Sequence, residues 1–81
     1  MKVKVNYYGH FRELLGIGEE VLEVGGKVTV GELLKLVLKR HPELEKRNGS
    51  IFVSVNHRSA DSEKFIKEGD QVSIFPPVGG G

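Results

Sequence analysis

The sequence predicts one α+β domain, in which one main helix lies across one face of a mixed sheet of four to five strands. Two observations carry this prediction. Strands of alternating polarity open and close the chain, and a single apolar stripe with helical spacing lies between them. The length of 81 residues agrees, because so short a chain buries about 60% of its unfolded surface and cannot build two cores.

The first strand is predicted over residues 2–8, where apolar and polar side chains alternate strictly. This alternation is typical of a strand with one buried face. One face carries Val3, Val5 and Tyr7, and the other carries Lys2, Lys4, Asn6 and Tyr8.

A short helix and a second strand follow. Residues 19–24 alternate again and predict a strand antiparallel to the first. Residues 10–15 predict the short helix, since three apolar side chains stand at helical spacing: Phe11, Leu14 and Leu15.

The main helix is predicted over residues 29–41. Thr29 and Glu32 have the spacing of a reciprocal capping box, and Pro42 cannot continue a helix. The apolar stripe that should cover the sheet consists of Val30, Leu33, Leu34, Val37 and Leu38.

A third main strand is predicted over residues 51–55, after a charged segment at residues 44–49 that leads through a turn into it. Asn56 and His57 predict a tight turn, because Asn tolerates a positive φ. Residues 58–59 then begin a short return strand.

The last strand is predicted over residues 71–75, after an irregular segment at residues 61–67 in which Phe65 and Ile66 plug one end of the core. The first and last strands both have the pattern of interior strands, so we expect them to lie side by side and parallel. One helix across such a mixed sheet is the β-grasp arrangement.

Residues 76–81 are predicted to form an extended tail outside the domain of residues 1–75. Pro76 and Pro77 have no N–H for a sheet, and the extended tail reaches ~20 Å, well beyond a domain of ~12 Å radius of gyration. Composition alone also fits a frayed terminus. The last strand runs directly into the prolines, however, which favours a tail that the fold aims outward, with the Gly81 carboxylate at its tip.

Composition excludes several classes of function. The net charge of +1 offers no bulk attraction to nucleic acid or to a membrane surface, and no stretch has the apolar length of a membrane span. The absence of cysteine excludes disulfides and thiolate chemistry and suits a reducing compartment. We therefore expect a cytoplasmic protein with neither nucleic acid nor membrane as partner.

No residue pattern predicts catalysis or a metal site. His10, His41 and His57 are far apart and lack ligand spacing. The glycines at 16 and 18 precede a strand, whereas phosphate-binding loops open a helix. We expect no bound cofactor and no metal. The Gly81 carboxylate is the one reactive group, and ATP for its activation must be bound by a separate enzyme.

Three aromatic residues are predicted on the sheet face away from the main helix: Tyr8, Phe52 and Phe75. Phe52 and Phe75 have the opposite parity to the core-facing residues of their strands. Exposed aromatic residues beside the tail fit a binding surface, and they also fit isolated surface side chains.

Six short motifs follow one another over the whole chain, at residues 7–14, 29–34, 41–44, 53–56, 67–72 and 75–81. The most specific is a Gly-Asp turn, a last strand, Pro-Pro-Val and terminal glycines. Together and in this order they resemble the small subunit of molybdopterin synthase, a sulfur carrier of the ubiquitin-like family that includes the thiamine carrier. This sequence has Gly79 where family tails often have Ser, and Asn56-His57 where Asn-Gly is commoner.

The resemblance implies a ubiquitin-like β-grasp that acts as a sulfur-donating subunit without an active site of its own. An E1-like enzyme would adenylate Gly81 with ATP, and the carboxylate would become a thiocarboxylate. The tail would then enter the large synthase subunit of a heterotetramer and give sulfur to a cyclic pterin precursor, for a molybdenum or tungsten cofactor. The partner-binding residues would be Tyr8, Phe52, Phe75, Pro76, Pro77, Val78, Gly79 and Gly80.

Three alternatives remain from the sequence. A thiamine-type carrier would use the same terminal chemistry. A protein modifier would join Gly81 to lysines of target proteins through an isopeptide bond. A plain interaction domain would have an inert tail.

Overall fold

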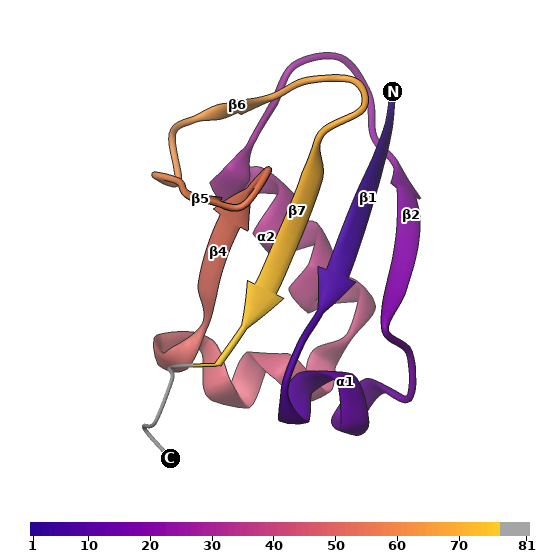
Figure 1. Cartoon of the computed structure of the whole chain (residues 1–81), viewed down its shortest axis with the longest axis vertical. Coiled ribbons are helices and arrows are strands. Elements are labelled where there is room, and N and C mark those ends of the chain that lie inside the picture. Colours follow the sequence, from indigo (N-terminus) through magenta and orange to yellow (C-terminus); the bar gives the residue numbers. More distant parts are fainter. Residues whose placement is uncertain (77–81) are drawn as a thin grey trace.

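The computed structural model describes residues 1–76, except for the side chains of residues 47–50. The elements are β1 (Lys2–Tyr7), α1 (His10–Leu15), β2 (Glu19–Glu23), β3 (Val28–Thr29), α2 (Val30–Arg40), the 3-10 helix η1 (Pro42–Ser50), β4 (Phe52–Val55), β5 (Arg58–Ser59), β6 (Phe65–Ile66) and β7 (Gln71–Phe75). Figure 1 shows their arrangement. No helix within residues 1–76 is long and apolar enough to cross a membrane.

The main sheet has five strands in the order β2-β1-β7-β4-β5. β1 and β7 are parallel, and the other neighbours are antiparallel. This confirms the predicted parallel pairing of the first and last strands and the mixed β-grasp sheet. β3 and β6 form a separate antiparallel pair of two residues each.

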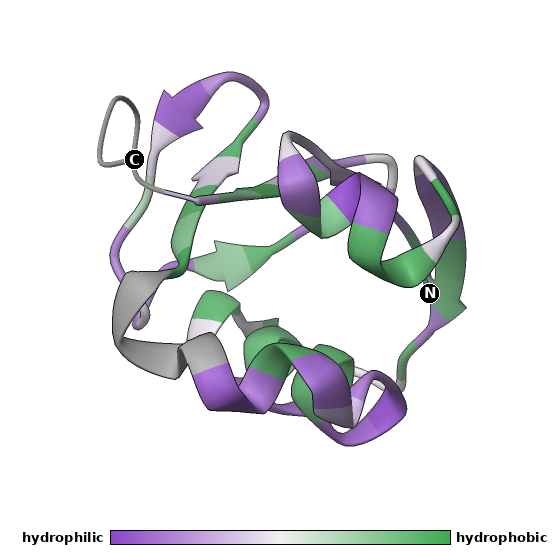
Figure 2. Cartoon of the chain, turned by 90° about the horizontal axis from the view of Figure 1, so that it is seen from below, coloured by the Kyte–Doolittle hydropathy of each residue, from purple (hydrophilic) through white to green (hydrophobic). Residues whose placement is uncertain are grey.

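The face of the sheet toward α2, which we call the covered face, forms the core. In Figure 1 α2 lies behind the sheet, and in Figure 2 it lies to one side of it. Alternation places Val3, Val5 and Tyr7 on this face, and all three are fully buried. Val72 and Ile74 of β7 continue the same buried layer on the neighbouring strand.

The capping box predicts the start of α2 correctly. The Glu32 N–H donates to Thr29 Oγ1 at 3.1 Å, and the Thr29 N–H donates to Glu32 Oε1 at 2.9 Å. Four residues of the stripe are buried and Leu34 is partly buried, so the helix packs along the predicted side. His41 caps the other end, directly before Pro42.

The charged segment, for which no helix was predicted, lies in the 3-10 helix η1 (Pro42–Ser50), and this helix contributes to the core. Pro42 stands at its first turn, where the missing N–H costs no hydrogen bond. Leu44 is fully buried. A single apolar residue among charges gives no periodic signal, so the sequence did not reveal it.

Phe65 does not plug the core as predicted. Its side chain is 54% exposed, whereas Ile66 is 4% exposed. The two residues form β6, and successive side chains of a strand point to opposite faces, so only one of them can face inward. Leu14 of α1 is also exposed, while Phe11 on the same helix is buried.

Candidate functional site

The open face of the sheet, opposite to α2, carries the predicted aromatic residues. In the β4–β7 pair Phe52 lies directly opposite Phe75, and Ser54 lies opposite Ser73. The two phenyl rings have centroids 6.0 Å apart at an interplanar angle of 60°. This edge-to-face geometry is favourable for an aromatic pair.

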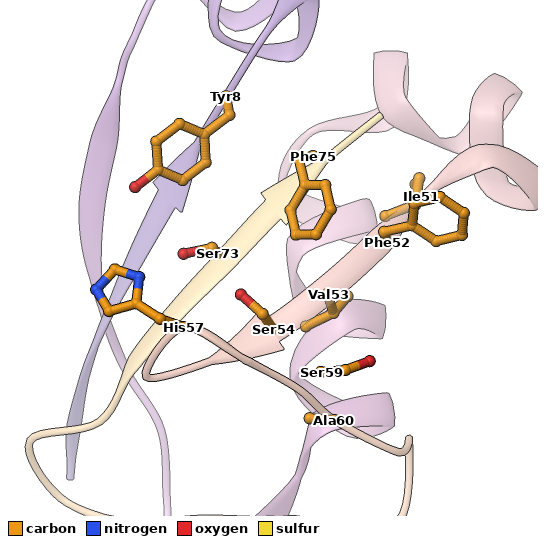
Figure 3. Close-up of a pocket in the computed structure, with 10 residues that line it drawn as sticks. All are labelled: Tyr8, Ile51, Phe52, Val53, Ser54, His57, Ser59, Ala60, Ser73 and Phe75. Carbon is orange, nitrogen blue, oxygen red and sulfur yellow. The ribbon is translucent and has the colours of Figure 1, made fainter. Parts of the chain in front are cut away.

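Tyr8 lies next to this pair, directly after β1, which is the neighbour of β7 on the side away from β4. Its N–H donates to the Ile74 carbonyl at 3.1 Å and extends the ladder between β1 and β7 by one step. Figure 3 shows the Tyr8 ring over the end of β1, next to the β7 strand that carries Phe75. Tyr8 is 43% exposed and Phe52 is 50% exposed. The structure thus brings the three aromatic residues together, and their role in binding stays a prediction.

These aromatic residues form one end of a hollow of about 730 Å³ on the open face. The hollow is completed by Ile51, Val53, Ser54, His57, Ser59, Ala60 and Ser73. The hydroxyls of Ser54 and Ser73 lie in its middle in Figure 3. An aromatic end and a polar centre suit docking of a protein surface.

The sequence analysis missed the part of the hollow that surrounds His57. We predicted His57 only as a turn residue and not as part of a surface hollow. The predicted turn at Asn56 and His57 is confirmed, with φ angles of 51° and 69°. The predicted turn could have revealed this position of His57. It ends β4 and places His57 at the edge of the sheet face that carries Phe52 and Ser54.

Hydrogen bonds hold this turn against the start of β7. The Asn56 N–H donates to the Gln71 carbonyl at 2.8 Å, and the Gln71 N–H donates to Asn56 Oδ1 at 3.0 Å. Asn56 Nδ2 also donates to Asp70 Oδ1 at 3.0 Å. Burial raises the pKa of Asp70, but the Lys67 N–H and the Asn56 amide outweigh it and hold that pKa below its ordinary value. The polar end of the hollow is therefore fixed to the sheet.

Gly9 contacts the beginning of the tail. Its φ of 60° and ψ of −143° suit glycine almost alone. A Cβ at this position would lie 3.1 Å from Cγ of Pro76 and 3.3 Å from its Cδ. Gly9 thus sets the path on which the chain leaves β7, a role that the sequence analysis missed. Of the predicted tail, Pro76 is described, whereas Pro77, Val78, Gly79, Gly80 and Gly81 lie outside the described residues.

A second polar cluster lies on the covered face, at Glu20 of β2. Tyr7 Oη donates to Glu20 Oε2 at 2.5 Å, and Arg40 Nε donates to Glu20 Oε1 at 2.8 Å. His41 Nε2 lies 2.6 Å from Glu20 Oε2. Burial raises the pKa of Glu20, but these hydrogen bonds lower it further than burial raises it. Burial, followed by the hydrogen bond to Glu20, raises the pKa of Tyr7 strongly.

The Glu20 cluster joins the end of α2 to the first two strands. Its groups are already paired with one another, which is typical of a structural network. Among residues 1–76, apart from the side chains of 47–50, no three metal-binding side chains gather as a metal site would require.

The sheet order and the covering helix define a ubiquitin-like β-grasp domain whose last strand leads into Pro76. The model of the ThiS family matches residues 5–81, and the chain belongs to this family. That membership confirms the family resemblance seen in the sequence. The match extends through the tail, beyond the residues that the structure describes.

The relatives include sulfur carriers. The chain is 33% identical to the molybdopterin synthase sulfur carrier subunit of Chlamydomonas reinhardtii, and the alignment covers 100% of both chains. Its structure is similar to that of a Pyrococcus furiosus protein described as molybdopterin converting factor, subunit 1, with 32% identity, coverage of 96% and 99%, and a TM-score of 0.88.

Two further structures bear on partners. SAMP1 from Haloferax volcanii is 29% identical over 100% of both chains, with a TM-score of 0.87. A chain in the complex of subunits 1 and 2 of molybdopterin-converting factor from Helicobacter pylori is 26% identical over 100% of both chains, with a TM-score of 0.74.

Proposed function

We propose that this chain is the sulfur carrier subunit of a molybdopterin synthase and that Gly81 carries the sulfur. The observation that carries the proposal is the course of the C-terminal end. β7 lies between β1 and β4, runs past the aromatic end of the hollow and leads into Pro76. The family match through residue 81 and the similarity to carrier subunits support the same reading.

The chemistry is confined to the terminal carboxyl group. A carboxylate oxygen attacks the α-phosphorus of ATP, pyrophosphate leaves, and an acyl adenylate forms. A sulfide equivalent then attacks the acyl carbon and displaces AMP, which leaves a thiocarboxylate. In the synthase the thiocarboxylate sulfur attacks an electrophilic carbon of the cyclic pterin precursor. A carbon–sulfur bond forms while a carbon–oxygen bond of that carbon breaks, and its electron pair goes to the oxygen. Water hydrolyses the resulting thioester, so the sulfur stays on the pterin and the carboxylate is regenerated.

ATP and pterin are bound by partner proteins in this proposal. The described hollow is open and has no lysine or arginine in its lining, whereas triphosphate sites use cations or backbone amides at helix starts. An E1-like enzyme supplies the ATP site, and this chain holds no cofactor. We place the carrier in the cytoplasm, because a chain without cysteine suits a reducing compartment.

The large synthase subunit is the proposed docking partner, within a heterotetramer. The Helicobacter pylori complex of subunits 1 and 2 supports a partner of this kind. Tyr8, Phe52 and Phe75 would rest on its surface, because partly exposed aromatic residues are the commonest anchors of protein interfaces. The tail from Pro76 to Gly81 would enter a channel that is too narrow for larger residues.

Intact mass spectrometry tests the proposal. The full chain is incubated with an E1-like activating enzyme, ATP and a sulfur donor. We expect a mass gain equal to the exchange of one oxygen for sulfur, and no gain in a variant that lacks Gly81. If the wild-type mass stays unchanged while a known carrier gains sulfur in parallel, the proposal is wrong.

A protein modifier is the second candidate, because SAMP1 of Haloferax volcanii is so similar in structure. In that case Gly81 would form an isopeptide bond with lysine side chains. Immunoblots of cells that express a tagged chain would then show higher-mass conjugates that disappear when Gly81 is deleted.

A further inference from the structure

A second exposed groove lies at the opposite edge of the sheet, between β2 and α2. It has a volume of about 420 Å³ and is lined by Val21, Leu22, Glu23, Leu36, Lys39 and Arg40. Val21 is 59% exposed and Leu36 is 44% exposed. Neither residue contributes to the hollow on the open face. Register and alternation place the Val21 side chain on the open face beside Lys4, whereas Leu36 lies on α2, on the covered side of the sheet. The β2 edge therefore has one exposed apolar side chain on each of its two sides, on elements that the proposed function does not use.

The backbone of β2 presents unpaired hydrogen-bonding groups beside this groove. The sheet order of the described residues places β2 at an edge. The Val24 N–H donates to the Met1 carbonyl, and the Tyr7 N–H donates to the Gly18 carbonyl. In an antiparallel pair, every second residue of a strand directs its backbone N–H and C=O groups to the neighbouring strand. The register therefore directs the backbone groups of the even-numbered residues of β2 to β1. The N–H and C=O groups of Glu19, Val21 and Glu23 therefore point outward.

The charges around the groove favour an acidic occupant. Glu23 is paired with the N-terminal ammonium at 3.0 Å, and Glu19 with Lys4 Nζ at 3.3 Å. Lys39 has no ion pair among the described residues. Arg40 reaches Glu20 with Nε while its side chain stays 57% exposed. The net unpaired charge on the helix side of the groove is positive.

We propose that the β2–α2 groove binds an extended segment of another protein, with apolar residues in its middle and acidic residues beside them. The segment would add to β2 as a further strand of the sheet. Its backbone would pair with Glu19, Val21 and Glu23. Because successive side chains of a strand alternate, one set of its side chains would contact Leu36 on the α2 side and the other set would contact Val21 on the open face. Its carboxylates would lie near Lys39.

A second copy of this chain fits the edge poorly. Antiparallel pairing of two β2 strands centred on Val21 would place Glu19 of each copy opposite Glu23 of the other. Like charges directly opposite each other destabilise a strand pair. The same glutamates thus act against self-association, a usual protection of sheet edges.

The groove is separate from the proposed carrier site. β2 and β4 are separated by β1 and β7, which at usual strand spacing is about 14 Å. A partner could therefore bind the groove while the hollow and the tail are occupied. The proposal does not depend on sulfur transfer, and a variant without Gly81 should bind the segment equally well.

Nuclear magnetic resonance of the full, ¹⁵N-labelled chain tests the proposal. The probe is the peptide acetyl-Gly-Asp-Ile-Val-Val-Val-Asp-Asp-Gly-amide, and the control has lysine in place of each aspartate. We expect the acidic peptide to shift the amide signals of Glu19, Val21 and Glu23 more than those of Glu20 and Leu22. We expect the lysine peptide to bind at least about fivefold more weakly.

Two surface variants sharpen the test. V21D and K39E should each weaken the acidic peptide about tenfold, because each replaces an attractive contact with a like charge. F52A, in the hollow, should bind it as wild type does. Thiocarboxylate formation on V21D should stay normal, which separates this proposal from the carrier function.

Three results would overturn the proposal. The first is no shift at β2 with millimolar acidic peptide. The second is a shift of signals around the hollow in place of those of β2. The third is a set of β2 shifts that depends on protein concentration without peptide, which would make a second copy the occupant.

Discussion

The two faces of one sheet differ sharply, although the same strands build both. The covered face holds Val3, Val5, Val72 and Ile74, each exposed by 1% or less. The open face holds the cross-strand pairs Phe52–Phe75 and Ser54–Ser73. Period-two alternation assigns neighbouring residues to opposite faces, so a single strand packs the core with one parity and presents the other parity on the open face.

On the open face, aromatic and polar side chains are separated from each other along the sheet. The aromatic residues gather where β7 leads into Pro76, and the polar residues gather toward His57. The covered face is uniform by contrast, with Glu20 as an acidic exception near its end. Substitutions on the two faces should therefore separate folding from function.

The largest effect is expected on the covered face. L33A should lower the free energy of unfolding by about 2–5 kcal/mol, because Leu33 is almost fully buried and its truncation leaves a cavity. Urea unfolding followed by circular dichroism measures this change. The matched control is L36A on the same helix, where the leucine is exposed. Equal losses for both variants would contradict the assignment of the two helix faces.

The meeting point of β1 and the tail should be the next most sensitive. G9A should cost about 1–3 kcal/mol of stability, because alanine is strained at this φ and its Cβ would press on Pro76. It should also slow thiocarboxylate formation at Gly81, which mass spectrometry can follow over time. G25A is the control, since a Cβ there meets nothing within 4 Å. Unchanged stability and rate in G9A would exclude a positioning role for Gly9.

The open face should respond in binding while its stability changes little. F52A should weaken the complex with the large synthase subunit about tenfold or more, as expected for an aromatic anchor. Titration calorimetry gives the affinity, and thermal unfolding checks the fold. F65A removes an equally exposed ring outside the hollow and should bind normally. Equal weakening in both variants would argue against the hollow as the docking surface.

The smallest effect is expected at Glu20, the acidic residue on the covered face. E20Q should cost about 1 kcal/mol at neutral pH, because Tyr7 and Arg40 would donate to a neutral amide in place of a charged carboxylate. The folded state lowers the pKa of Glu20 below its ordinary 4.5. The stabilisation is therefore fully present above pH 4.5 and is lost as the pH falls through the lower, folded value.

Urea unfolding of wild type and E20Q at about pH 7 and about pH 3 measures this dependence. The difference between the two proteins should shrink at the lower pH. The control is E19Q, because the Glu19 side chain is 61% exposed and, within the part of the chain that the structure describes, forms an ion pair with Lys4 alone. A difference between wild type and E20Q that grows on acidification would contradict the sign of the pKa change.

Most of the fold could be predicted from sequence, because its signals are local and periodic. Alternation located β1 and β7, and the capping box located the start of α2 to the residue. The burial of Leu44 and the exposure of Phe65 could not be predicted. Both depend on which surface a short, aperiodic segment meets, and that surface is built from distant parts of the chain.

The candidate site divides in the same way. Parity within each strand indicated that Tyr8, Phe52 and Phe75 leave the core. Only the pairing of β1, β7 and β4 could add His57, Ser54 and Ser73 to one hollow.

By itself the sequence determined the β-grasp class and the family resemblance, because local periodicity and an ordered set of motifs are properties of the chain. It also identified the Gly81 carboxylate as the group to examine. Only the tertiary structure decided that Gly9 lies against Pro76, that Glu20 joins β2 to the end of α2, and that β2 is an open edge beside exposed apolar residues. These are contacts between segments far apart in sequence. Strand order and register fix such contacts, and no local pattern encodes them.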